Sequence, residues 1–133
     1  MEQITLVKDA IHRPDDPRHF MEYKYVDQYY VARIGKTIVA ESRTILKLSE
    51  VGHHIYDPVP YFPLSDTRLD LLQATDKSSH CPLKGNTRYY DFNNGDSYVE
   101  AVGWCYSQAY DFASVLAAYV AFDDRLVDIS MTN

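Results

Sequence analysis

The chain has 133 residues, of which 46% are hydrophobic and 24% are charged, and its 13 basic and 19 acidic residues give a formal net charge of −6. This length is typical of one compact domain, and the apolar content is too high for a disordered chain. The acidic balance argues against binding to a nucleic-acid backbone or to an anionic membrane surface. We therefore expect a globular protein with neither of those partners.

The N-terminal part differs from the rest of the chain. Ile4–Val7 is a short apolar stretch that predicts a strand, and no apolar core long enough for a signal peptide follows it. His12–Phe20 combines two prolines with charged and imidazole groups, which predicts an irregular arm that cannot join a β-ladder. These features divide the chain into a strand and arm, residues 1–20, and one β-rich domain, residues 21–133, and we expect a cytoplasmic protein.

Two turn signals predict hairpins in the body of the chain. Gly35–Lys36 places glycine first, as a two-residue type II′ turn requires, and Asn93–Asp96 holds residues that tolerate left-handed backbone. The segments rich in β-branched and aromatic residues, or with alternating polarity, are predicted strands. They are Gln28–Ile34, Thr37–Ala40, Ser42–Leu48, Arg68–Ala74, Arg88–Phe92, Tyr98–Tyr106 and Tyr119–Phe122.

One helix is predicted, over Asp111–Ala118. Asp111 has a side chain that can cap a helix N-terminus, and Phe112, Val115, Leu116 and Tyr119 follow a helical period. The expected fold is therefore mainly β, with small antiparallel sheets forming a compact barrel-like or tent-like sandwich and one short helix near the C-terminus.

The densest group of reactive side chains is at Ser78–Gly85. It contains His80, Cys81 and Lys84, and basic groups near a thiol can favour a nucleophilic thiolate. Cys81 and His80 are therefore the catalytic candidates. Adjacent strand residues point to opposite faces, however, which favours the alternative that Cys81 is a small buried residue. Cys81 and Cys105 are expected to be free thiols, because a chain with two cysteines and no visible export signal fits a reducing compartment.

The sequence predicts no metal ligand and no cofactor. Asp66 and Asp70 would lie about 13 Å apart in an extended chain, too far for one ion. His53, His54 and His80 lack the spacing of a zinc site. Asp66 is the kind of residue that also anchors a turn through local backbone hydrogen bonds.

The sequence has 12 tyrosines and one tryptophan, which suggests an aromatic small-ligand pocket. Lys84 would attract an anionic group, and the aromatic side chains would form the walls. The candidate ligand-binding residues are Lys84, Tyr61, Asp66, His80, Trp104 and Tyr106, with Arg43 and Glu50 as further candidates.

Several segments occur in an order that resembles a known family. They are Ile38–Arg43, Glu50, Tyr61-Phe62-Pro63 with Asp66, His80–Gly85 with Tyr89-Tyr90, Trp104 with Tyr106, and Tyr119–Phe122. Together they resemble the domain-of-unknown-function family 427, also labelled a nucleotidyltransferase-type domain, from about Val31 to Asp128. The resemblance implies a small, mostly β, tent-like fold. The chain departs from the family pattern at Ser107–Ala109, where a proline is usual, and at Thr67, where a hydrophobic residue is usual.

These observations leave three functional hypotheses. The leading one is a domain that binds a small anionic ligand, and the sequence leaves open whether it also acts on that ligand as an enzyme. The alternative is a structural or protein-interaction module, and self-association into a homo-oligomer is also left open. A nucleotidyltransferase is the weakest hypothesis, because the sequence shows neither two close carboxylates nor a phosphate-binding glycine loop.

Overall fold

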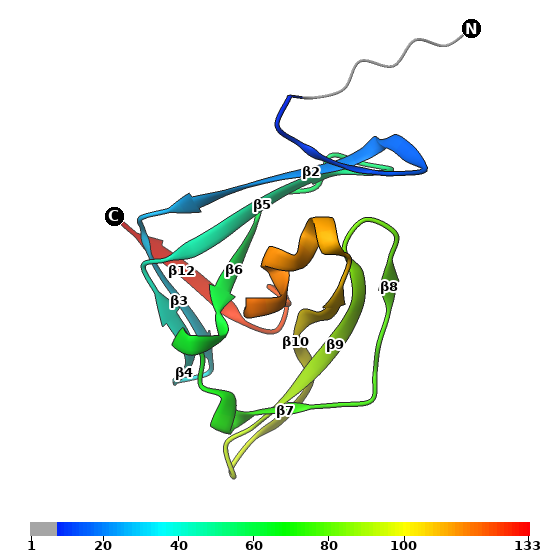
Figure 1. The fold of residues 1–133 in the computed structure, drawn as a ribbon. Helices are drawn as coiled ribbons and strands as arrows, with labels where there is room; N and C mark the ends of the chain where they lie inside the picture. Colours follow the sequence, from blue (N-terminus) through cyan, green and yellow to red (C-terminus); the bar gives the residue numbers. More distant parts are fainter. Residues whose placement is uncertain (1–7) are drawn as a thin grey trace, which may run out of the picture.

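The structure is a computed structural model that describes residues 8–133, so the strand expected at Ile4–Val7 lies outside the described residues. Antiparallel strands and short 3₁₀ helices make up the fold (Figure 1). The strands are β1 (Ile11–Arg13), β2 (Asp16–Val26), β3 (Tyr29–Ile34), β4 (Thr37–Ser42), β5 (Ile45–Val51), β6 (Val59–Pro63), β7 (Leu72–Ala74), β8 (His80–Cys81), β9 (Gly85–Asn93), β10 (Tyr98–Ala109), β11 (Tyr119–Phe122) and β12 (Asp128–Thr132). The helices are η1 (Leu64–Asp66), η2 (Leu69–Leu71) and η3 (Asp111–Ala118).

The strands form two sheets. The larger has nine strands in the order β1-β2-β5-β6-β11-β10-β9-β7, with β8 paired to β9, and the smaller has the order β12-β3-β4. Every strand pairing is antiparallel, and the sheets form an open sandwich rather than a closed barrel. The predicted mainly β fold is confirmed.

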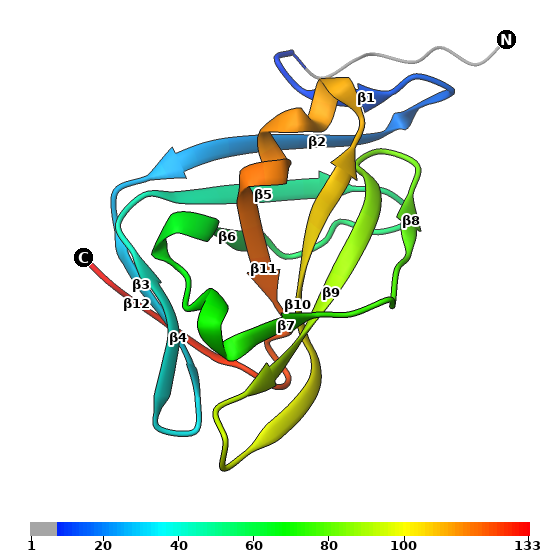
Figure 2. The same ribbon diagram turned by 60° about the horizontal axis from the view of Figure 1, so that its bottom comes forward.

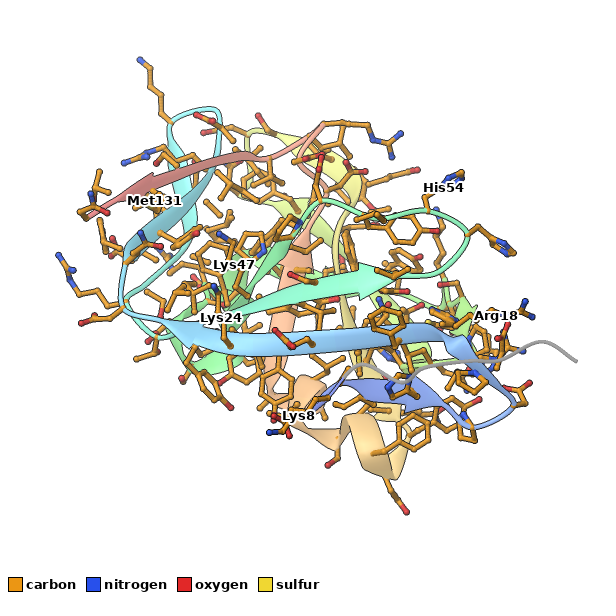
Figure 3. All side chains as sticks on the ribbon, turned by 90° about the horizontal axis from the view of Figure 1, so that it is seen from above. Lys8, Arg18, Lys24, Lys47, His54 and Met131 are labelled. Carbon is orange, nitrogen blue, oxygen red and sulfur yellow. The ribbon has the colours of Figure 1, made fainter. Side chains whose placement is uncertain are left out.

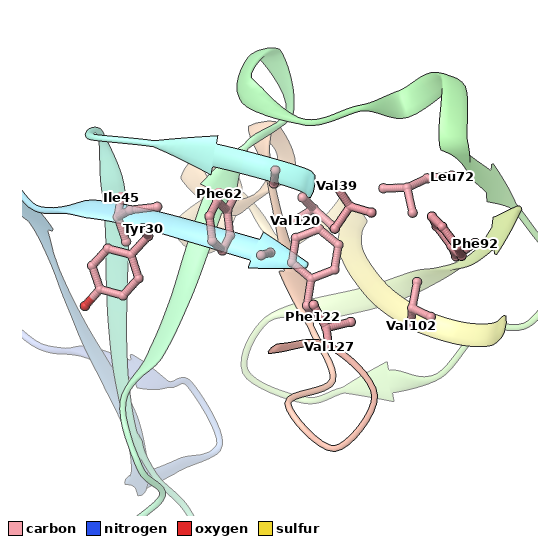
Figure 4. Close-up of a cluster of buried hydrophobic side chains, with 12 residues drawn as sticks. Tyr30, Val39, Ile45, Phe62, Leu72, Phe92, Val102, Val120, Phe122 and Val127 are labelled. Atoms are coloured by element: carbon pink, nitrogen blue, oxygen red, sulfur yellow. The ribbon is translucent and has the colours of Figure 1, made fainter. Parts of the chain in front are cut away.

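The central strands β5, β6 and β11 carry apolar side chains on both faces. One face packs against the three-stranded sheet (Figure 4), and the other packs with η3 and the turn after β8. Because successive strand residues point to opposite faces, neighbouring residues of each strand enter different clusters. These neighbours are Ile45 and Leu46, Tyr61 and Phe62, and Val120 and Ala121. A sheet covered on both faces thus accounts for the uninterrupted apolar sequence of β11.

Both predicted hairpins are present. β3 and β4 pair as far as Ile34 and Thr37, which leaves Gly35 and Lys36 as the turn. Gly35 has φ of +60°, as the first position of a type II′ turn requires. The second hairpin joins β9 to β10, and in its loop the Asn94 side-chain oxygen accepts hydrogen bonds from the backbone N–H groups of Asp96 and Ser97.

The prediction that His12–Phe20 is an irregular arm is wrong. β1 and β2 pair across this segment, and β2 continues without a break past residue 20 to pair with β5. Pro17 is tolerated because it takes no part in either register, which places its missing N–H at a bulged edge of the sheet. The β1–β2 ribbon is therefore part of the larger sheet.

Two predicted strands have different bounds in the structure. Ser42–Leu48 is broken, because the Ser42 hydroxyl accepts a hydrogen bond from the Thr44 N–H, 2.9 Å away, and turns the chain between β4 and β5. In Arg68–Ala74 the first part forms η2, and only Leu72–Ala74 is a strand.

The predicted helix has the expected bounds but a different geometry. η3 is a 3₁₀ helix, its N-cap is Tyr110 rather than Asp111, and no side chain caps it. Ala113 and Leu116 are its buried residues, while Phe112 is 40% exposed. A 3₁₀ helix repeats every three residues, so the buried positions are three apart instead of following the expected α-helical face.

The β1–β2 ribbon has one polar and one packed face. Lys24 and Lys47 are paired across β2 and β5 (Figure 3), and η3, which crosses in front of β2 in Figure 2, shares a cluster of buried side chains with Met21 of β2. Figure 3 also shows Arg18 and His54 at one end of this part of the molecule and Met131 at the other. Within residues 8–133, no helix is both long and apolar enough to cross a membrane.

We predict that Gly85→Ala destabilises the fold severely. Gly85 has φ of +115°, and a Cβ there would lie 2.4 Å from the Gln108 carbonyl oxygen. Left-handed strain and the backbone clash together should lower the free energy of unfolding by about 3–5 kcal/mol. The control is Gly95→Ala, where φ is +92° but nothing lies within 4 Å, so the loss should be about 1–2 kcal/mol. Urea unfolding measures both, and equal losses would contradict the prediction.

Candidate functional site

A buried ammonium group lies at the centre of the candidate site. Lys84 is in the turn between β8 and β9, and its carbonyl oxygen accepts a hydrogen bond from the Tyr110 N–H, 3.1 Å away. This contact holds the turn against the end of β10. The Lys84 side chain is 10% exposed, and its Nζ lies 2.5 Å from Glu50 Oε1 and 5.1 Å from the centre of the Tyr106 ring. A charged group is tolerated here because a carboxylate and an aromatic face both stabilise it.

Glu50 connects Lys84 to the N-terminal ribbon. Its second oxygen, Oε2, accepts a hydrogen bond from His19 Nε2 at 2.8 Å. His19 belongs to β2 and Glu50 to β5, and the pairing of Met21 with Glu50 sets the two strands in the register that brings these side chains together. The Glu50 carboxylate is thus held at both oxygens by residues 31 and 34 positions away in sequence.

These contacts determine the charge states at neutral pH. Burial opposes ionisation of Glu50, but Lys84 and His19 outweigh it and hold the pKa of Glu50 below its ordinary value. Burial likewise opposes the charge of Lys84. The negative charges that Tyr61 and Tyr106 acquire when they ionise at high pH, together with Glu50, outweigh burial and raise the pKa of Lys84. Burial raises the pKa of Tyr61 and of Tyr106. The site therefore holds a charged ion pair among neutral phenols.

Cys81 adds a sulfur atom to this arrangement. One imidazole nitrogen of His19, one carboxylate oxygen of Glu50 and Cys81 Sγ all lie within 4.8 Å of one another. All three residues are half-buried, and Cys81 and Cys105 are free thiols. We refer to these three side chains as the His19–Glu50–Cys81 cluster.

Two adjoining cavities open beside the ion pair. The imidazole cavity, of about 640 Å³, is lined by Arg13, Asp16, Arg18, His19, Glu50, Gly52, His53, Tyr56, His80, Cys81 and Pro82. The aromatic cavity, of about 290 Å³, is lined by Leu48, Glu50, Tyr56, Asp57, Val59, Tyr61, Lys84 and Trp104. The two cavities share Glu50 and Tyr56, so one ligand can contact both.

The structure brings most of the sequence-predicted site residues together. Glu50, Tyr61, Lys84 and Trp104 line the aromatic cavity, and Tyr106 lies against Lys84. The catalytic candidates Cys81 and His80 line the imidazole cavity.

His80 does not act on its neighbour Cys81 in the way that the sequence suggested. Its Nδ1 lies 2.7 Å from the Asn86 side-chain oxygen and its Nε2 lies 3.0 Å from the Tyr110 hydroxyl. Both ring nitrogens are thus engaged by residues other than Cys81. The imidazole that meets Cys81 is that of His19.

Arg43 and Asp66 lie outside both cavities. The Arg43 guanidinium lies over the Tyr29 ring, 5.4 Å from its centre. Asp66 accepts a hydrogen bond of 2.6 Å from the Ser42 hydroxyl and so ties η1 to the end of β4. Both residues belong to the part of the molecule where the three-stranded sheet meets η1, away from Lys84.

His19 is not among the site residues predicted from the sequence, because the sequence predicts an irregular arm over His12–Phe20. One signal could have found it: in the sequence, the apolar or aromatic residues Met21, Tyr23 and Tyr25 alternate with the charged residues Glu22 and Lys24. This period of two is typical of a half-buried strand. It places the His19 side chain on the same face as Met21, which is fully buried.

The geometry can be compared with known proteins. The family model described as a domain of unknown function, DUF427, matches residues 30–133. The chain belongs to the DUF427 family. The DUF427 match includes Glu50, Cys81 and Lys84, whereas the β1–β2 ribbon with His19 precedes it. No curated protein matches the chain.

We predict that Lys84→Met destabilises this DUF427 protein by about 2–4 kcal/mol, because the half-buried Glu50 carboxylate loses its ammonium partner. The contribution of the lowered Glu50 pKa is complete above its ordinary value of 4.5 and is lost as the pH falls through the lowered pKa. The difference between wild type and variant should therefore narrow in acid, as measured by urea unfolding at several pH values.

The control for this prediction is Arg125→Met. Arg125 forms an ion pair of 2.8 Å with Asp123, but its side chain is 84% exposed. Its removal should leave the free energy of unfolding nearly unchanged. A Lys84→Met protein as stable as wild type at neutral pH would show that the ion pair does not stabilise the fold.

Proposed function

We propose that this protein binds a small molecule that combines an anionic group with an apolar or aromatic part. The anionic group would enter the imidazole cavity and the apolar part the aromatic cavity. The observation that carries the proposal is the gathering of cationic and imidazole side chains at one cavity of a chain whose net charge is −6. Those side chains are Arg13, Arg18, His19, His53 and His80.

Arg13 of the imidazole cavity retains hydrogen-bonding capacity for a ligand. Arg13 is paired with Asp15, and Arg18 is paired with Asp16. A guanidinium has five N–H donors in a planar fork, so the pairing of Arg13 with Asp15 through Nε and Nη2 leaves donors for a second anion. Both arginines are on the β1–β2 ribbon or the turn that closes it, which orients them toward the same cavity.

The lining of the aromatic cavity suits an apolar or aromatic group. Leu48, Val59, Tyr61 and Trp104 provide apolar surface, and the Glu50–Lys84 ion pair provides fixed polar groups at its edge. Small-ligand sites are commonly built from apolar walls with a few placed polar groups. Lys84 is already paired with Glu50, so we assign it the role of fixing Glu50. The ring nitrogens of His80 are also engaged, so we place the ligand anion on the arginines and His53.

A third cavity is unsuited to the same ligand. It has a volume of about 490 Å³, lies on another side of Trp104, and is lined by Asp57, Asp123, Asp124 and Asp128 with Arg125 as its cation. These carboxylates would repel an anion. The distribution of charge thus favours the imidazole cavity over this acidic cavity.

We predict that anionic aromatic probes bind and that their neutral analogues do not. Benzoate and AMP would be titrated against benzamide and adenosine, with the fluorescence of Trp104, the single tryptophan of the chain, as the readout. At 100 times its dissociation constant, a bound probe should add about 2.7 kcal/mol of stability. Replacing both Arg13 and Arg18 with Gln should weaken binding about tenfold or more, as expected for lost charged hydrogen bonds.

The matched control is Arg125→Gln, which removes an arginine from the acidic cavity. It should leave the affinity for the anionic probes unchanged. If no probe gives a saturable signal, or if Arg125→Gln weakens binding as much as the Arg13 and Arg18 replacements do, the binding proposal fails. The interaction-module hypothesis would then take its place.

A further inference from the structure

Three side chains of different chemistry converge at one point of the imidazole cavity. His19 comes from β2, Glu50 from β5 and Cys81 from β8, so residues far apart in sequence supply a nitrogen, an oxygen and a sulfur atom. No ligand-spacing motif connects these three positions, and the sequence predicted no metal ligand. The fold alone creates the cluster.

We propose that the His19–Glu50–Cys81 cluster is a binding site for a zinc-type divalent ion, with three protein ligands and a fourth position open to the imidazole cavity. The three donor atoms lie within 4.8 Å of one another. In a tetrahedral zinc site, bonds of about 2.0–2.3 Å place the donor atoms about 3.4–3.6 Å apart. Modest side-chain rotation therefore brings all three atoms into coordination distance. The ion replaces the proton between His19 and Glu50 and the thiol proton of Cys81, and both protons are released to solvent.

The donor set selects the class of ion. Imidazole nitrogen, carboxylate oxygen and thiolate sulfur together suit a borderline-soft ion such as Zn²⁺, whereas Mg²⁺ and Ca²⁺ take oxygen ligands. Three protein ligands with one open position are the arrangement of zinc sites that bind a further molecule. The open position would take water or the anionic group of a ligand.

The surrounding residues prepare Glu50 for this role. Lys84 bonds to Oε1 at 2.5 Å, which fixes the carboxylate and leaves Oε2 on the side of His19. Hydrogen bonds of this kind to a ligating carboxylate commonly orient metal sites. With the thiolate and carboxylate each contributing one negative charge, a divalent ion beside the Lys84 ammonium leaves one positive charge, which suits an anion at the fourth position.

The same three residues could instead resemble a nucleophilic thiol with its base and orienting acid. In such a relay the two nitrogens of the imidazole serve different partners, one the nucleophile and the other the carboxylate. Here a single nitrogen of His19 lies within 4.8 Å of both the carboxylate oxygen and the sulfur. Convergence on one point favours ion coordination over a relay.

The metal proposal does not depend on the anion proposal, because the ion can bind without a further ligand. The test is titration of the reduced, metal-free protein with Co²⁺ and Zn²⁺. Co²⁺ should bind one ion per chain and give a sulfur-to-cobalt charge-transfer band, which Zn²⁺ abolishes by displacement. Zn²⁺ should also protect Cys81 from alkylation.

Variants assign the site to the cluster. Cys81→Ser should remove the charge-transfer band, and Cys81→Ser and His19→Gln should each weaken Zn²⁺ binding by about 100-fold or more, beyond the loss usual for residues that only support a ligand. The controls are Cys105→Ala, which removes the other thiol, and His54→Gln, which removes an exposed imidazole that does not line the cavity. Both should bind the ion as wild type does. Circular dichroism would verify that each variant is folded.

Several results would overturn the proposal. They are the absence of stoichiometric binding by the wild type, equal losses in the control variants, and a charge-transfer band that survives Cys81→Ser. A thiol whose alkylation rate depends on His19 but is unaffected by Zn²⁺ would also overturn it and would support the relay. Failure of anionic probes to bind a protein that still binds Zn²⁺ would refute the anion proposal alone.

Discussion

The ion pair between Lys84 and Glu50 is the interaction on which the candidate site depends. It joins the turn before β9 to β5 across the larger sheet, and both partners are largely withdrawn from water. An isolated charge at either position would be costly, so each group stabilises the presence of the other. The Tyr106 ring, the Trp104 wall and the His19 imidazole are arranged around this pair. The candidate site therefore consists of the Lys84–Glu50 ion pair and the two cavities beside it.

The sequence predicted the parts of the fold that local chemistry determines. Gly35 at the first turn position and the Asn93–Asp96 loop specify their hairpins through backbone conformation and side-chain hydrogen bonds that involve only neighbouring residues. The predicted bounds of η3 are correct, but the structure has a 3₁₀ helix where the sequence pattern predicts an α-helical face. Ala113 and Leu116 are buried in a cluster formed with several strands, and those contacts are not encoded in the helix itself.

The predicted secondary structure is wrong where a strand forms through pairing with a distant segment of the chain. Pro17 argued against a strand, yet β2 forms because most of its length pairs with β5 beyond the proline. The same pairing brings His19 to Glu50, so the error in the fold became an error in the site. Four residues predicted from their chemistry do line one cavity in the structure: Glu50, Tyr61, Lys84 and Trp104. Arg43 and Asp66 were chosen by the same criterion, but they make contacts near the other sheet instead.

The β1–β2 ribbon and the Lys84–Glu50 ion pair belong to different parts of the sequence. The ion pair lies within the region that defines DUF427, whereas the ribbon that supplies Arg13, Arg18 and His19 precedes that region. Substitutions in the ribbon can change which groups face the imidazole cavity without altering either member of the ion pair. The ion pair and the arginines of the proposed anion site are thus encoded in different stretches of the chain, so substitutions can change the second while the first is conserved.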